Sequence, residues 1–175
     1  MKILVIESSP HKHGSSNLLA AEFRRGAEEA GHDVTVFDAG HTKLNPCLGC
    51  GACGMSGPCV QKDDMAEILR LFQEADVLVL ATPIYFYGIT AQMKTFIDRT
   101  YPIWQNLGEK EVYYIISAGL GKDIVDRSLG DLDGFVEHLE KYDIKGRIYA
   151  TEVMDAGLVK ETELMNTAYL MGRSV

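Results

Sequence analysis

The chain has 175 residues, the length of one domain, and its hydrophobic content of 46% is ordinary for a protein with a buried core. Its formal net charge of −8 at pH 7 disfavours a nucleic-acid partner, because phosphate contacts require a surplus of lysine and arginine. No apolar run reaches the roughly 18 residues of a membrane span, and the N-terminal one is too short for a signal peptide. We therefore expect one cytoplasmic domain, residues 1–175, with reduced cysteines and no membrane partner.

Apolar runs typical of buried strands alternate with segments of helical periodicity. In chain order, we predict a strand at 2–7, a helix at 18–30, a strand at 33–38, a cysteine-rich loop at about 44–62, a helix at 65–74, a strand at 77–81, a helix at 89–100, a strand at 111–117, a helix at 129–141, a strand at 147–154 and a helix at 161–171. Strands separated by helices form a parallel sheet with helices on both faces. Right-handed crossovers leave few topologies, and five strands suit an α/β, flavodoxin-like, doubly wound parallel sheet of order 2-1-3-4-5.

A sheet of this order binds ligands beyond the carboxyl ends of its strands, at the switch point between strands one and three. This rule selects residues 8–17, 83–88 and 117–121. The first of these loops leads into a helix, whose free backbone N–H groups favour a phosphate dianion; an ordinary helix-capping turn is the alternative. The loop lacks the GxxxxGK[ST] and GxGxxG patterns of nucleotide sites. Its candidate phosphate-binding residues are Ser9, His11, Lys12, Ser15, Ser16 and Asn17.

Three consecutive aromatic residues follow the third predicted strand. A strand with alternating faces cannot bury all three inward, so they are candidates for holding a flat aromatic ligand. The alternative is packing in the core or at a dimer interface. The candidate residues here are Pro83, Ile84, Tyr85, Phe86, Tyr87 and Gly88, and Ala118 and Gly119 of the third loop are candidates for another wall.

All four cysteines lie in the loop at about 44–62, in the pattern C-x2-C-x2-C-x5-C. Four thiolates this close can ligate one [4Fe–4S] cluster, and the intervening glycines allow the loop to wrap around it. A structural zinc site usually has two separated pairs of ligands, and a redox disulfide needs only two cysteines. We therefore favour a cluster over reduced or redox-active thiols, zinc or a purely structural role. The candidate ligands are Cys47, Cys50, Cys53 and Cys59.

Residues 9–17 resemble the FMN-phosphate loop of NAD(P)H-dependent FMN reductases, which have the flavodoxin fold. Residues 83–88, continuing into 93–99, are similar to the isoalloxazine segment of that family. The cysteine pattern, continued to residue 65, resembles the iron–sulfur flavoprotein branch. The resemblance is continuous from residue 1 to about residue 121. The chain departs from the family where Ser8 replaces glycine, His11 replaces arginine, and Ser15 and Ser16 replace a frequent Asn-Thr pair.

The resemblance implies an FMN-dependent oxidoreductase that takes hydride from NAD(P)H and passes electrons to a quinone, nitro, azo or similar acceptor. The cofactor carries that chemistry, so no catalytic side chain is needed. The alternative is an iron–sulfur flavoprotein electron carrier that exchanges electrons with ferredoxin. The resemblance also implies a homodimer or homotetramer, for which the aromatic stretch 100–104 is a candidate interface.

Overall fold

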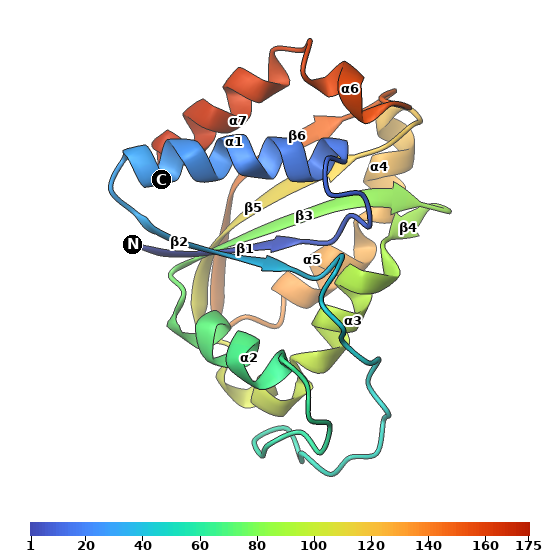
Figure 1. Ribbon diagram of the computed structural model, residues 1–175. Helices are drawn as coiled ribbons and strands as arrows, with labels where there is room; N and C mark the ends of the chain where they lie inside the picture. The colour runs from blue at the N-terminus through green and yellow to red at the C-terminus, as the bar shows by residue number, and fades with distance from the viewer.

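The structure, a computed structural model, describes residues 1–175, and a parallel sheet forms its centre (Figure 1). Its strands lie in the order β2-β1-β3-β5-β6, and every neighbouring pair is parallel. Counted along the five predicted strands, this is the predicted order 2-1-3-4-5, which is confirmed. A short extra strand, β4, pairs antiparallel with the end of β3. The strands are β1 (Lys2–Glu7), β2 (Asp33–Asp38), β3 (Val77–Tyr85), β4 (Gly88–Ile89), β5 (Glu109–Ser117) and β6 (Lys141–Ala150).

Helices cover both faces of the sheet, and each face has its own apolar core (Figure 1). One face carries α1 (Ser15–Glu29), α6 (Ala156–Val159) and α7 (Leu164–Arg173). The other face carries α2 (Met65–Glu74), α3 (Ala91–Arg99), α4 (Lys122–Ser128) and α5 (Gly130–Val136), with the 3-10 helix η1 (Tyr101–Asn106) following α3. The central strand β3 is buried from Val77 to Pro83 without a break, because helices cover it on both sides.

Two glycines allow α1 and α7 to pack closely. A Cβ atom at Gly26 would lie 2.0 Å from the Tyr169 carbonyl oxygen, and one at Gly172 would lie 1.9 Å from the Phe23 carbonyl oxygen. Both distances are far shorter than van der Waals contact. The backbone of α7 therefore contacts α1 at Gly26, and the backbone of α1 contacts α7 at Gly172. This packing therefore requires glycine at both positions.

Several predicted boundaries were wrong. Helix α1 begins at Ser15 rather than at residue 18, because its first turn is polar and apolar periodicity starts only afterwards. Strand β6 begins at Lys141 rather than at residue 147, since the first half of this edge strand is largely exposed and has no apolar run. The helix predicted at 129–141 is the shorter α5, and α4 before it was not predicted. None of the helices combines the length and the apolar character that crossing a bilayer requires.

Candidate functional site

The structure brings the three predicted loops together at the carboxyl edge of the sheet (Figure 1). Directly after β1, the Ser8 N–H and hydroxyl both donate to the Ala81 carbonyl in β3, at 3.0 Å each. The Thr90 hydroxyl, just after β4, donates to the Ser8 hydroxyl at 2.9 Å. Pro83 of β3 pairs in turn with Ser117 at the end of β5. Buried hydroxyls therefore connect the first loop to the β3–β4 hairpin, a role for Thr90 that the sequence analysis did not identify.

The first turn of α1 has the features of an anion site. Its first intrahelical hydrogen bond runs from the Leu18 N–H to the Gly14 carbonyl, so the N–H groups of Ser15, Ser16 and Asn17 have no acceptor. These three residues are buried, and the turn has no acidic side chain. Ser16 Oγ and Asn17 Oδ1 are also buried without a hydrogen-bond partner. A buried polar group without a partner costs free energy. A phosphate bound at this point would offset that cost by accepting hydrogen bonds from the Ser16 hydroxyl and the free N–H groups; Asn17 Oδ1 is an acceptor and could not donate to it.

The other candidates in this loop are divided between its floor and its rim. Ser9 is buried, and its Oγ accepts a hydrogen bond from the His11 N–H at 3.2 Å. A Cβ atom at Gly14 would lie 2.5 Å from Ser9 Oγ, so a larger residue there would displace the Ser9 hydroxyl. The side chains of His11 and Lys12 are exposed. Within the loop it is the His11 carbonyl, not its ring, that makes a contact: the carbonyl accepts a hydrogen bond from the Gly14 N–H at 2.8 Å.

The aromatic residues form the tip of the β3–β4 hairpin. Tyr85 pairs with Gly88, so Phe86 and Tyr87 are the two residues of the turn. Both have positive φ, 48° and 64°, as a type I′ turn requires, although bulky side chains are unfavourable in that region. The side chain of Phe86 is fully exposed and Tyr85 and Tyr87 are also exposed, so core packing is not their role. Strain and exposure of this kind are typical of a site that contacts a ligand or partner.

The third loop contributes small residues to the same edge. Ala118 is buried, and its N–H donates to the Ala150 carbonyl at 2.9 Å. A Cβ atom at Gly119 would lie 2.4 Å from Sδ of Met154, an exposed side chain that the sequence analysis did not identify. The Met154 thioether therefore lies against Gly119, where a side chain would displace it.

A carboxyl group with a perturbed pKa lies at the base of the first loop. The pKa of Glu7, the last residue of β1, is raised to about 7, mainly by burial and further by Asp38. Asp38 contacts the His41 ring at 2.9 Å, and Nε2 of that ring lies 3.1 Å from the Pro10 carbonyl. His41 therefore links the end of β2 to the first loop, and Glu7 titrates next to this link.

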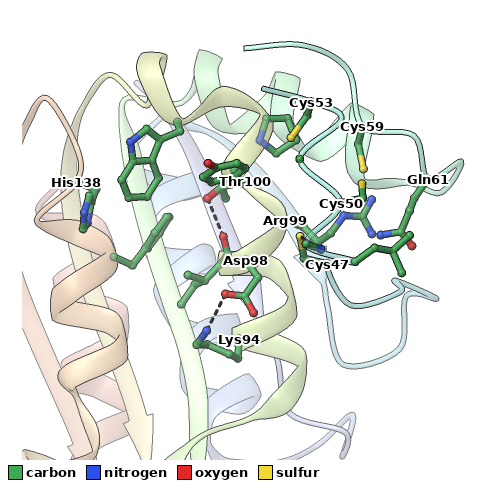
Figure 2. Close-up of a pocket in the computed structure, with 18 of the residues that line it drawn as sticks. Cys47, Cys50, Cys53, Cys59, Gln61, Lys94, Asp98, Arg99, Thr100 and His138 are labelled. Atoms are coloured by element: carbon green, nitrogen blue, oxygen red, sulfur yellow. Dashed lines mark hydrogen bonds and ion pairs between the residues drawn. The ribbon is translucent and has the colours of Figure 1, made fainter. Parts of the chain in front are cut away.

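The cysteine loop, residues 44–62, lies away from this edge, beside α2 and the end of α3 (Figure 1). All four cysteines are free thiols and line one cavity of about 690 Å³ between the loop, α3, η1 and α5 (Figure 2). Their sulfurs do not converge on one point: no group of three or more potential ligands is arranged to hold a metal ion. The donor set, four thiols on one glycine-rich loop, has the chemistry of a [4Fe–4S] site. The loop would have to draw its sulfurs together to bind one.

A buried ion pair closes the base of the cysteine loop. The Arg99 guanidinium, at the end of α3, donates to both carboxylate oxygens of Asp63, at 2.7 and 2.8 Å, and to the Asn45 carbonyl at 2.7 Å. These hydrogen bonds hold the pKa of Asp63 below its ordinary value and raise the pKa of Arg99. The ion pair between these two residues was not expected from the sequence, because nothing in the local pattern shows that they meet.

Comparison with known proteins identifies the family. Residues 1–150 match the model of the NADPH-dependent FMN reductase family. An iron–sulfur flavoprotein from Archaeoglobus fulgidus is 40% identical over 125 residues, which cover 70% of this chain and 57% of that protein. The chain spans about half the length of the curated relatives it matches.

Solved structures support the fold. An NAD(P)H:quinone oxidoreductase from Methanothermobacter marburgensis superimposes with a TM-score of 0.73 at 16% identity, covering 99% of this chain and 95% of that one. An azoreductase from Bacillus anthracis gives 0.76 at 14% identity, with full coverage of both chains. At these identities the likeness establishes a flavodoxin-like fold and no more. The match over residues 1–150 establishes the rest: the chain belongs to the NADPH-dependent FMN reductase family.

Proposed function

We propose that the chain is an FMN-dependent oxidoreductase that passes electrons from NAD(P)H through FMN to a quinone, nitro, azo or similar acceptor. The observation that carries the proposal is the first turn of α1, where Ser16 Oγ and the N–H groups of Ser15, Ser16 and Asn17 have no partners. The FMN phosphate would accept hydrogen bonds from these groups, and the helix dipole would favour its negative charge. Membership of the family supports a flavin as the bearer of that phosphate.

The hairpin tip supports a flavin ring beside the phosphate. Tyr85, Phe86 and Tyr87 would contact the isoalloxazine, and Ala118 and Gly119 would form the opposite wall. FMN, when bound, supplies the electron chemistry, and the chain's residues bind it, orient it and restrict water. Pro83, Ile84 and Gly88 set the course of the hairpin backbone, while His11 and Lys12 would contribute charge at the rim.

The test is to titrate flavin-free protein with FMN, FAD and riboflavin while following flavin fluorescence. We expect one FMN per chain. Riboflavin, which lacks the phosphate, should bind at least about tenfold more weakly, because it forgoes several charge-assisted hydrogen bonds. Anaerobic mixing with NADH or NADPH should then bleach the flavin, and a quinone, nitro or azo compound should restore its colour. Equal affinity for FMN and riboflavin would refute the phosphate assignment, and no bleaching would refute the enzyme.

The second candidate function is an iron–sulfur flavoprotein electron carrier that exchanges electrons with ferredoxin. It is favoured by four free thiols on one cavity wall and by the iron–sulfur flavoprotein from A. fulgidus. In this proposal Cys47, Cys50, Cys53 and Cys59 hold a [4Fe–4S] cluster. Protein purified and reconstituted without air should contain about four iron atoms per chain. Steady-state NAD(P)H oxidation separates the two functions, because a carrier would not turn over with NAD(P)H alone.

Self-association is part of the proposal. Tyr101 and Trp104, next to the cysteine loop, are 39% and 37% exposed, and their ring centroids lie 6.0 Å apart. Exposed aromatic pairs are enriched in interfaces, so we expect a homodimer or homotetramer. Sedimentation at micromolar concentration tests this, and a monomer would contradict it.

A further inference from the structure

Arg99 is an unusual residue in its position. It is the last residue of α3 and only 1% exposed, although most of that helix surface is partly exposed. A charged side chain is rarely buried so completely without several partners, because desolvation of the charge is costly. The burial of Arg99 therefore depends on the groups that it contacts.

Those contacts join the two ends of the cysteine loop. Arg99 binds Asp63 at one end and the Asn45 carbonyl at the other, and the Asp63 carboxylate also accepts the Asn45 N–H at 3.4 Å and the Met65 N–H at 3.3 Å. Outside this network, the two ends of the loop are also joined by a hydrogen bond from Gln61 Nε2 to the Pro46 carbonyl at 3.0 Å. All four cysteines lie within the loop that this network closes.

Two N–H donors of Arg99 remain outside this network, the Nε–H and one Nη2–H. Its Nε is buried and has no hydrogen-bond partner. Arg99 lines the same cavity as the four cysteines, and Cys59 is among the groups that raise the pKa of Arg99, after Asp63 (Figure 2). A buried guanidinium N–H without an acceptor, in the wall of the cavity that the cysteines also line, is a donor available to a thiolate or to a cluster ligand.

We propose that Arg99 is the positioning residue of the cysteine loop: its fork to Asp63 and Asn45 closes the loop, and its Nε donates to the Cys59 sulfur when the cysteines ligate iron. The loop is then closed at its base, and its glycine-rich tip gathers around the ligand. This inference rests on the proposed cluster for its second half, while the closure of the loop stands without it.

The test compares wild type with Arg99→Lys, Arg99→Gln and Asp63→Asn. Lysine keeps a charge for Asp63 but loses the planar fork, so it is the variant best able to fold. Arg127→Gln is the matched control, because Arg127 forms an exposed pair with Asp123 on α4 at 3.1 Å. FMN content and thermal unfolding report folding for every variant, and α3 is unaffected in the control.

The first readout uses iron-free protein and a thiol-alkylating reagent, with each cysteine resolved by mass spectrometry. Cys47 and Cys50 are exposed and serve as internal standards, whereas Cys59 is only partly exposed. We expect the alkylation rate of Cys59 relative to Cys47 to rise about tenfold or more in the three variants, because a lost charged hydrogen bond favours local opening. An unchanged ratio in a folded variant would overturn the closing role.

The second readout is iron per chain after anaerobic reconstitution. Wild type and Arg127→Gln should load fully, and the Arg99 and Asp63 variants should load less than half as much iron at equal FMN content. Whatever cluster Arg99→Gln retains should have a lower midpoint potential than wild type, since a charged donor to sulfur is lost. Full loading with an unchanged potential would overturn the donor role. Wild type without iron would refute the cluster itself, and the alkylation ratio would still decide the loop closure.

Discussion

Replacing Ser16 by alanine should change the free protein and the flavin complex in opposite directions. The side chain is 0% exposed, and its hydroxyl has no partner in the protein. Without ligand, removing a buried unsatisfied hydroxyl should raise the free energy of unfolding by about 1 kcal/mol. With FMN bound, the same change should remove a charge-assisted hydrogen bond of about 1.5–3 kcal/mol and weaken binding about ten- to hundredfold.

Urea denaturation of flavin-free protein measures the first effect, and fluorescence titration with FMN measures the second. Ser128→Ala is a useful comparison, because the Ser128 hydroxyl is buried but already donates to the Ile124 carbonyl at 2.7 Å. That variant should lose stability without losing FMN affinity. If Ser16→Ala destabilised the free protein, or left FMN affinity unchanged, the assignment of the first turn of α1 as the phosphate site would be wrong.

Three further predictions follow from the geometry. The pKa of Glu7 is raised to about 7, so its contribution to stability is present at low pH and is lost as the pH rises through 7. In urea titrations, the free energy of unfolding of Glu7→Gln relative to wild type should therefore be greater at pH 8 than at pH 5. An equal difference at the two pH values would contradict the raised pKa. Gly172→Ala should destabilise the protein by about 1–3 kcal/mol or more, because its Cβ would lie 1.9 Å from the Phe23 carbonyl oxygen. Gly134→Ala in α5, where a Cβ meets nothing within 4 Å, is the matched control and should stabilise by about 0.5–1 kcal/mol. The double substitution Phe86→Asn and Tyr87→Gly should stabilise the free protein by about 1 kcal/mol or more, because Asn and Gly tolerate the positive φ of this turn. The affinity for FMN should fall in the same variant. Unchanged affinity would exclude the hairpin tip from the flavin site.

The fold was largely predictable because β1, β3 and β5 are buried on both faces and carry continuous apolar runs. The edge strand β6 was misplaced, since its exposed first half carries no such signal. The loop after the first strand could be located from its position between a strand and a helix, and the rule for parallel sheets correctly placed it at the carboxyl edge.

What the sequence did not reveal was contact between distant residues. Arg99 and Asp63 are 36 positions apart, and their ion pair depends on how α3 and the cysteine loop are placed in three dimensions. Thr90 likewise reaches Ser8 only because β3 and β1 are neighbours. The left-handed turn at Phe86 was also unforeseen, because aromatic residues rarely adopt it.

We propose that the first turn of α1 binds the phosphate of FMN. The most direct measurement is a ³¹P nuclear magnetic resonance titration of flavin-free wild type and Ser16→Ala with FMN. We expect a single phosphate resonance in the wild-type complex, shifted from free FMN and insensitive to a paramagnetic ion in solvent because the residues of this turn are buried. The Ser16→Ala complex should give a different shift. A bound flavin whose phosphate resonance matches that of free FMN would contradict the account.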